Sequence, residues 1–314
     1  MNTMLWLTWR QHRWTIAATA ALALLGAYSL LSTEIGNARY DSMPIAGFYG
    51  LMVQLSFGAV IGMFWGAPLI ARELEERTYF VAWGQDVTPA VWLRGKVLVL
   101  GGLAVVLGLA VGAGDGFSGA QKSWSQFEGS PLVQAGYAFL GFALGVLVGL
   151  LTRHVVTAIA ATLVFYTLIR AVQAALMRDH YMPVERSIAR WESTVDVPPS
   201  ALEIARGFVG PDLDPVPLTD LCEGLPNPNS CMRASKTAIG TYVDYQPIDR
   251  LVIFQVVEFV ICALIAAGLL FLTFRLLRRG GGWKPSRSHR RLESEESVEP
   301  VQSTPEVAAA QAEG

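Results

Sequence analysis

The chain has 314 residues, of which 52% are hydrophobic and 16% are charged, and its mean hydropathy is +0.39. Soluble domains carry about 25% charged residues, so this composition excludes an ordinary soluble domain. The formal net charge of −2 says little about partners, because the charges are segregated along the chain, and we expect no nucleic-acid partner.

The apolar residues gather into six runs, each long enough to cross a bilayer. The predicted spans are 14–32, 48–70, 97–114, 132–152, 155–176 and 251–274. The expected fold is an all-α polytopic membrane protein with six transmembrane helices, in a transmembrane domain over residues 1–280. A signal peptide cleaved near Ala38 is the alternative for the first run, but that run is longer than a signal h-region.

The distribution of arginine and lysine predicts which side of the membrane each loop faces. Basic residues precede the first span, lie between the second and third and between the fourth and fifth, and follow the sixth. The short loops opposite hold only Arg39 and Lys122. We therefore expect a multi-pass protein of the plasma membrane with both termini in the cytoplasm. Residues 281–314 are polar and rich in charge, which favours a disordered cytoplasmic tail.

Two spans carry glycine at every fourth position, which lines one helix face and permits close approach of a second helix. The positions are Gly58, Gly62 and Gly66 in the second span and Gly141, Gly145 and Gly149 in the fourth. These faces form either a contact between subunits or tight packing within one bundle. The third predicted span is short and glycine-rich, so we expect it to bend or to thin the bilayer locally.

Residues 177–250 form a long outer loop, which we expect to be a small extracytoplasmic cap between the fifth and sixth spans. We predict helices at 184–193 and 200–208, and turns elsewhere because the loop is rich in proline. Cys222 and Cys231 are nine positions apart, and on the oxidising side of a membrane they are expected to form a disulfide. The alternative is a metal site, for which no histidine or third cysteine lies nearby.

Two charged residues fall inside predicted spans. Arg170 and Glu258 both lie roughly 10–12 Å below the outer membrane boundary, at 1.5 Å per helical residue. An intramembrane charge is costly unless it is paired or lines a wet cavity. The sequence therefore predicts an ion pair, with Gln173 and Gln255 at the same level. This polar cluster either lines a transport path or gate, or it locks two helices together.

No group of residues predicts catalysis or a metal centre. The four histidines are scattered without metal-ligand spacing, and neither a nucleophile elbow nor a phosphate-binding loop is present. Glu75-Glu76 invites comparison with CPBP-type intramembrane proteases, but Phe80 stands where their motif requires arginine. We expect a chain that is not an enzyme and binds no cofactor itself.

The most informative stretch, residues 71–96, lies between the second and third spans and reads ARELEERTYFVAWGQDVTPAVWLRGK. Its first half is charged and helix-favouring, and Asp86 to Pro89 predicts a turn. A short second amphipathic helix is expected to end at Lys96, where the next apolar run begins.

This stretch resembles the cytoplasmic loop of ABC-2 type transporter permeases. In that family an acidic helix follows the second span, and a turn leads to Gly-Lys at the mouth of the third. The matching positions are Arg72-Glu73, Glu75, Arg77-Thr78, Val87-Thr88-Pro89 and Gly95-Lys96. Asp86-Val-Thr-Pro departs from the more usual Pro-Val-Ser/Thr-Arg. Tyr245-Gln246-Pro247, Phe254-Gln255 and Glu258 are similar to the actinobacterial branch of the family.

The resemblance implies the permease subunit of an ATP-binding cassette exporter. A separate ATP-binding subunit, carrying ATP and Mg, would dock on the 71–96 loop with residues 73–85 as the coupling helix. The chain would pair with a second copy or a paralogue, and its second and fifth spans would line the path. The expected docking residues are Glu73, Glu75, Glu76, Arg77, Thr78, Trp83 and Gln85.

Two other interpretations stay open. The 71–96 loop is alternatively a solvated charged helix that caps the bundle. The chain is alternatively a membrane sensor or scaffold that signals through an associated ATPase without transport, with the outer cap as the sensing element.

Overall fold

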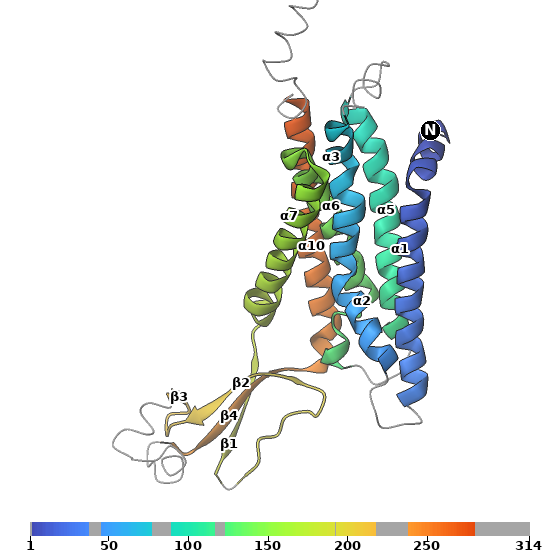
Figure 1. Cartoon of the computed structure of the whole chain (residues 1–314). Coiled ribbons are helices and arrows are strands. Elements are labelled where there is room, and N and C mark those ends of the chain that lie inside the picture. Colours follow the sequence, from blue (N-terminus) through green and yellow to red (C-terminus); the bar gives the residue numbers. More distant parts are fainter. Residues whose placement is uncertain are drawn as a thin grey trace, which may run out of the picture.

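The structure is a computed structural model that describes residues 2–37, 45–76, 89–116, 123–191, 193–217 and 238–279. Long helices form a bundle, and a small β-sheet lies at one end of it (Figure 1). In this part of the chain, five helices are long and apolar enough to cross a membrane: Phe48–Glu75, Pro89–Gly114, Trp124–Thr152, Val155–His180 and Ile248–Arg278. They overlap the last five predicted spans, and the chain is a polytopic membrane protein.

The elements follow one another in a simple order. The first half contains α1 (Asn2–Asn37), α2 (Ile45–Ile61), the π-helical turn η1 (Gly62–Gly66), α3 (Ala67–Glu75) and α5 (Pro89–Gly116). The second half of the bundle contains η2 (Trp124–Gln126), α6 (Pro131–Thr152), α7 (Val155–Val172), the π-helical turn η3 (Gln173–Met177), η4 (Arg178–His180), η5 (Ile248–Arg250) and α10 (Leu251–Arg278). The first predicted span, 14–32, lies within α1, which is one continuous helix of 36 residues.

The third span is longer than predicted. The prediction of a short span at 97–114, preceded by a separate amphipathic helix, was wrong, because α5 runs unbroken for 28 residues from Pro89. Its first turns are amphipathic: Trp92 and Leu93 are buried while Arg94 is exposed. Charged residues on one face do not interrupt a helix whose other face packs against the bundle. At 1.5 Å per residue, the 28 residues of α5 extend about 42 Å.

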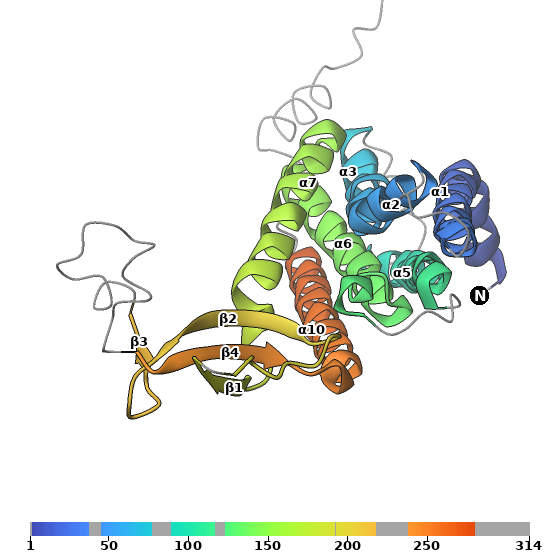
Figure 2. The same cartoon turned by 90° about the horizontal axis from the view of Figure 1, so that it is seen from below.

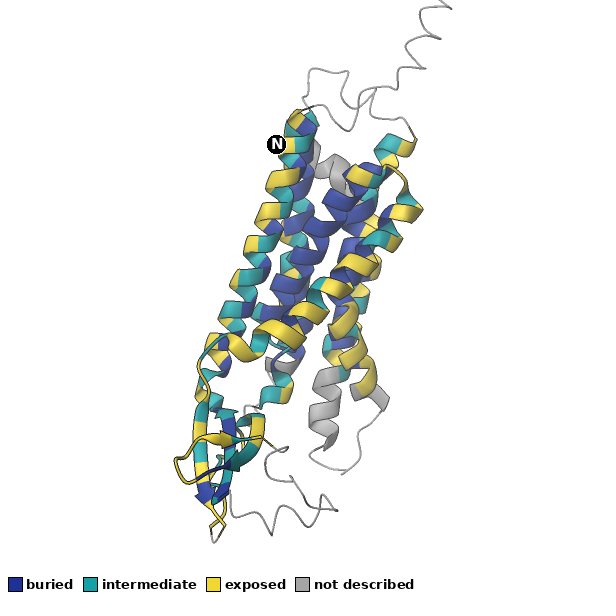
Figure 3. Cartoon of the chain, turned by 90° about the vertical axis from the view of Figure 1, so that its left-hand side faces the viewer, coloured by how far each residue is buried: buried dark blue, intermediate teal, exposed yellow. Residues whose placement is uncertain are grey.

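The bundle is organised around α6, which packs against α2, α3, α5, α7 and α10. In the membrane-spanning segment of α6, 83% of the residues are buried inside the bundle. In the corresponding segment of α7, only 17% are buried. Helix α6 is apolar on all sides, which is typical of a helix surrounded by others. It lies between its neighbours in Figure 2, and Figure 3 shows the buried residues along the bundle centre with exposed α7 residues outside.

The two glycine series meet each other inside one chain. A Cβ on Gly62 would lie 2.6 Å from the carbonyl oxygen of Gly141, and one on Gly58 would lie 2.7 Å from that of Tyr137. Gly145 and Gly149 likewise face the backbone of η1 and α3. Of the two interpretations of these series, the structure shows tight packing within one bundle.

The described part of the segment 177–250 contains a four-stranded antiparallel sheet in the order β1-β4-β2-β3. Its strands are β1 (Glu185–Arg190), β2 (Leu202–Val209), β3 (Pro215–Val216) and β4 (Gly240–Gln246). The predicted helices at 184–193 and 200–208 were therefore wrong, and the fold is mostly helical rather than all-α.

The physical reason is an alternation of period two in these segments. Exposed and less exposed residues alternate along β1, where Ala189 is buried and Arg190, the last residue, is exposed. Arg186 donates to both carboxylate oxygens of Asp244, directly opposite on β4, at 2.7 and 2.8 Å. Such cross-strand pairs stabilise a sheet, and this one joins residues too far apart in the chain to meet within a single helix. This bond, despite some desolvation, raises the pKa of Arg186 above its ordinary value.

The sheet is joined to α10 by a short connection. Strand β4 ends at Gln246, and η5 leads directly into the helix. Arg250 donates to the carbonyl oxygen of Pro183 at 2.8 Å and to the carboxylate of Glu185 at 2.6 Å. The start of α1 and the end of α10 both lie at the end of the bundle opposite the sheet (Figure 1).

Candidate functional site

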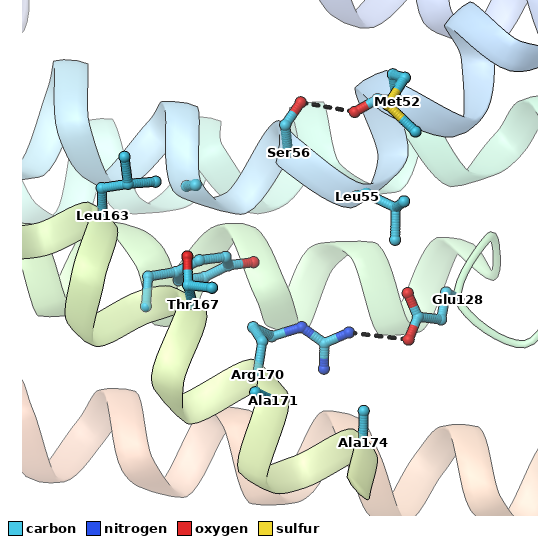
Figure 4. A pocket seen from close by; sticks show the side chains of 11 residues that line it. Met52, Leu55, Ser56, Glu128, Leu163, Thr167, Arg170, Ala171 and Ala174 are labelled. Carbon is cyan, nitrogen blue, oxygen red and sulfur yellow. Dashed lines mark hydrogen bonds and ion pairs between the residues drawn. The ribbon is translucent and has the colours of Figure 1, made fainter.

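A groove of about 460 Å³ runs between α2 and α7. Most of its walls are apolar, including Leu55 on α2 and Leu163 on α7, and Ser56 and Thr167 add hydroxyls. One end carries charge, where the Arg170 side chain reaches from α7 toward Glu128 (Figure 4). The lining residues are Met52, Leu55, Ser56, Ala59, Glu128, Leu163, Tyr166, Thr167, Arg170, Ala171 and Ala174.

Arg170 joins three parts of the chain at this end of the groove. Its Nη1 donates to Glu258 Oε1 on α10 at 2.9 Å, and its Nη2 donates to Glu128 Oε1, ahead of α6, at 3.1 Å. The guanidinium also lies 3.4 Å from the centre of the Tyr137 ring on α6. A planar guanidinium with several fixed donors suits such bridging better than a lysine ammonium does. The structure thus contains the ion pair predicted between Arg170 and Glu258.

Glu258 is fully buried and has a partner for each carboxylate oxygen. Tyr137 donates its hydroxyl to Oε1 at 3.0 Å, and Tyr181 donates its own to Oε2 at 2.5 Å. Arg178 lies 3.6 Å from Oε1 as a second cation. A buried carboxylate is tolerated only when it is paired and hydrogen-bonded in this way. Burial and the bond to Glu258 raise the pKa of Tyr181, which lies just beyond the span, above its ordinary value.

Glu128 and Arg178 complete the charged cluster. Arg178 Nη2 donates to Glu128 Oε1 at 2.9 Å, and its guanidinium lies 4.3 Å from the centre of the Phe127 ring. Together with Arg170 and Glu258 this makes two cations and two anions, so the cluster is formally neutral. A neutral set is the least costly way to keep four charges at the edge of a membrane.

The two predicted glutamines differ in their roles. Gln173, buried at the start of η3, accepts from Arg170 at 3.5 Å and donates to Cys262 Sγ at 3.3 Å. Gln255 is half-buried, and within the described residues it makes no hydrogen bond to the cluster. The cluster therefore includes Gln173 and leaves Gln255 aside.

Four members of the cluster were missed in the sequence: Glu128, Tyr137, Arg178 and Tyr181. Glu128 and Arg178 lie outside the predicted spans, where charge is unremarkable. The signal available was the length of the fifth apolar segment, since η3 and η4 continue α7 to His180. Tyr137 lies within the fourth predicted span, and a tyrosine in an apolar run does not by itself indicate a polar contact.

The opposite end of the bundle holds the described part of the predicted docking loop. Glu73 pairs with Lys96 at 3.4 Å, and the Lys96 side chain is only 7% exposed. The Lys96 ammonium also lies 4.1 Å from the centre of the Trp92 ring. This pair ties the end of α3 to the start of α5.

Glu75 makes a second tie from α3. Its Oε2 accepts the backbone N–H of Val155 at 2.8 Å, and its Oε1 lies 3.9 Å from His154 Nδ1. Val155 opens α7, and a carboxylate at a helix N-terminus satisfies a free donor and complements the helix dipole. Glu75 therefore connects α3 to the start of the helix that carries Arg170.

Glu76 is the most exposed of these glutamates and pairs with Arg72 one turn earlier, at 2.8 Å. Both side chains of this pair are at least half exposed. The other expected docking residues (Arg77, Thr78, Trp83 and Gln85) lie outside the described residues, as do Cys222, Cys231 and the tail 281–314. The predicted docking role of the loop stays a prediction, while its glutamates also cap the bundle.

Comparison with known proteins gives one family. Residues 37–178 match the family described as ABC-2 membrane transporter related. The matched region contains the groove between α2 and α7, the loop between α3 and α5, and three of the four charged cluster residues. No curated protein and no solved structure matches the chain.

Proposed function

We propose that the chain is the permease subunit of an exporter driven by a separate ATP-binding subunit, since residues 37–178 match the family described as ABC-2 membrane transporter related. ATP and Mg would be held by that partner. The observation that carries the proposal is the groove of about 460 Å³ between α2 and α7.

The groove suits an apolar or amphiphilic substrate. Its walls are mainly apolar, and a guanidinium and a carboxylate stand at one end. Apolar walls with a few polar groups at fixed positions are typical of small-molecule sites. Arg170 and Glu128 would contact the polar part of the substrate at the outer end of its path.

A second copy of the chain, or a paralogue, would close the groove. Helix α7 is little covered within one chain, and Leu163, Val164 and Leu168 on it are exposed. A partner packed beside α2 and α7 would turn an open groove into an enclosed path between subunits. This arrangement supports a dimeric transporter.

The contacts of α3 supply a route from the ATPase to the groove. Glu73 connects α3 to α5 through Lys96, and Glu75 connects α3 to the start of α7. A push on the loop between α3 and α5 would therefore move α7, which lines the groove. We assign the ATPase contact to this loop, with exposed Arg72 and Glu76 at its described edge.

The proposed location is the plasma membrane, with both termini in the cytoplasm. The start of α1, the end of α3, the start of α5 and the end of α10 lie at one end of the bundle, opposite the sheet (Figure 1). This end is rich in arginine, and from the positive-inside rule we infer that it faces the cytoplasm. The sheet then lies outside the cell.

The experiment that tests the proposal is affinity purification of the chain in mild detergent, with mass spectrometry of what accompanies it. We expect a soluble protein with a phosphate-binding loop motif in near-stoichiometric amount. A chain that purifies alone, also after gentle crosslinking, would contradict the proposal.

Docking is tested by exchanging the charges of one exposed pair, as Arg72→Glu with Glu76→Arg. The exchange keeps an i,i+4 ion pair and so keeps the helix, while it reverses the charges that the ATPase meets. We expect the variant chain to insert into the membrane normally, and the ATPase no longer to drive transport through it. The matched control exchanges Glu203 and Arg206, an exposed pair on β2. Equal ATP-driven activity in both variants would reject the docking assignment.

A sensor that signals through the ATPase without transport is the second candidate. The observation in its favour is that β4 leads through η5 directly into α10, the helix that bears Glu258. A ligand on the sheet would thus act on the charged cluster. ATP-dependent movement of substrate in inverted vesicles distinguishes the candidates, because only the exporter produces it.

A further inference from the structure

A second cavity, of about 830 Å³, lies between the first turns of α5 and the last turns of α10. It shares no lining residue with the α2–α7 groove, and no acidic residue lines it. Four exposed arginines surround it: Arg94, Arg275, Arg278 and Arg279. The cavity is thus strongly basic.

The lining is arranged in two layers. Leu98 follows Arg94 by four residues on α5, and Phe271 precedes Arg275 by four on α10. Four helical residues rise about 6 Å. Because the two helices run in opposite directions, both basic layers lie at the same end and both apolar layers lie deeper in the bundle. The cavity has the polarity of an amphiphile, with a basic end and an apolar end.

The apolar layer opens to the outside of the bundle. Leu98 and Phe271 are each 67% exposed, while Val97 and Phe274 line the cavity from its inner side. Exposed apolar side chains at this depth of a membrane helix face lipid chains. An occupant of the cavity can therefore enter sideways from the bilayer.

We propose that this cavity binds the phosphate headgroup of an anionic phospholipid, with the acyl chains along Leu98 and Phe271. Guanidinium groups bind phosphate through paired, charge-assisted hydrogen bonds. Basic pockets between transmembrane helices on the cytoplasmic side are suited to anionic headgroups. In the orientation proposed above, the lipid comes from the cytoplasmic leaflet.

Two features favour a lipid over a general excess of basic residues at this end. Arg94 on α5 and the three arginines at the end of α10 come from two distant parts of the chain and gather around one cavity, which the positive-inside rule alone does not require. Within the described residues, none of the four arginines has an ion-pair partner. The lipid would fix the start of α5, next to the proposed docking loop, against α10.

The test is native mass spectrometry of the full chain, purified in mild detergent, with phosphatidylglycerol or with phosphatidylcholine of the same acyl chains. We expect phosphatidylglycerol to stay bound and phosphatidylcholine to be lost. The double variant Arg275→Gln with Arg278→Gln removes two charge-assisted contacts, so lipid retention should fall more than about tenfold. Arg94→Gln, on the other helix, should lower it in the same direction.

The matched control is Arg10→Gln with Arg13→Gln, which removes the same charge from α1 at the same end of the bundle. Equal loss of phosphatidylglycerol in this control would overturn the proposal in favour of general electrostatic attraction. Displacement of the lipid by millimolar inorganic phosphate would show a free-phosphate site instead. Binding by a chain lacking residues 281–314, but not by the full chain, would show that the acidic stretch 293–299 occupies the cavity. The assay needs no ATPase, so its failure would leave the transport proposal standing.

Discussion

Arg170 on α7 and Glu258 on α10 lie 88 positions apart in the chain, yet their side chains meet at 2.9 Å inside the bundle. The arginine is 14% exposed and the glutamate not at all. The contact therefore combines a buried anion with a cation that also reaches the α2–α7 groove. The contribution of this ion pair to the free energy of unfolding can be measured.

Arg170→Gln and Glu258→Gln, singly and together, form a double-mutant cycle. Each single change leaves a buried charge with fewer partners, which costs about 3–5 kcal/mol. The double variant should recover about 0.5–3 kcal/mol relative to the sum of the two single changes. Thermal unfolding in detergent gives the values. Arg206→Gln, in an exposed pair on β2, is the control and should cost under about 1 kcal/mol. Additive effects at Arg170 and Glu258 would contradict the pairing.

The glycine contact between the second and fourth spans should tolerate no side chain. Gly62→Ala places a Cβ against the Gly141 carbonyl, and such overpacking costs about 1–3 kcal/mol. Gly102→Ala on α5 is the matched control, because its Cβ would meet nothing within 4 Å. The control should be neutral or stabilising by up to about 1 kcal/mol. Melting temperatures measured side by side check both, and equal values would refute the close packing.

Glu73 and Glu76 should differ in their contribution to stability although they lie one turn apart. Glu73→Gln leaves Lys96 buried without its counter-charge, which costs about 1–3 kcal/mol. Glu76→Gln breaks only an exposed pair, worth under about 1 kcal/mol. Thermal unfolding of the two variants is the measurement. A larger loss for Glu76→Gln would show that the Glu73–Lys96 contact is not stabilising.

Filling the groove should stop transport without unfolding the chain. Ala171 lines the groove, so Ala171→Trp would obstruct it, whereas Val156 lies on α7 outside it and is 79% exposed. Val156→Trp, in the first turn of the same helix, is therefore the control with the same new side chain. We expect ATP-dependent flux in vesicles to be lost only for Ala171→Trp. Flux that survives this change would remove the groove from the path.

Cys222 and Cys231 are expected to be joined by a disulfide, because the loop that carries them lies outside the cell in the proposed orientation. Proteolysis of the unreduced protein followed by mass spectrometry should yield one crosslinked peptide pair. Cys262, buried in α10, is the internal control and should stay reduced. Two free thiols in the loop, in protein purified under oxidising conditions, would contradict both the disulfide and the orientation.

The sequence predicts a site residue well where a charged side chain falls inside an apolar run, because such a residue needs a partner. Arg170 and Glu258 stand out because they interrupt apolar runs, and their equal depth identified them as partners. Glu128 and Arg178 complete the same cluster but flank the spans, where charged residues are common. Their role depends on how the helix ends meet, which no local pattern encodes.

The four-stranded sheet was not predicted, because no local pattern distinguishes its strands from helices. Segments 185–190 and 202–209 mix charged and apolar residues, and their strand character depends on pairing with β4, more than thirty positions later for β2. Arg186 acquires its partner Asp244 only in that pairing. Local propensity alone is a weak guide to strands, because their stability comes from neighbours across the sheet.

The glycine contact between α2 and α6 also has a genetic consequence. All glycine codons begin with a pair of guanines, and any single-base change that replaces the residue introduces at least a Cβ or ends translation. At Gly58, Gly62 and Gly141 that atom would meet backbone. The centre of the bundle is thus a concentrated target for loss-of-function point mutations, whereas Gly102 and Gly268, with open space beside them, should drift freely to alanine.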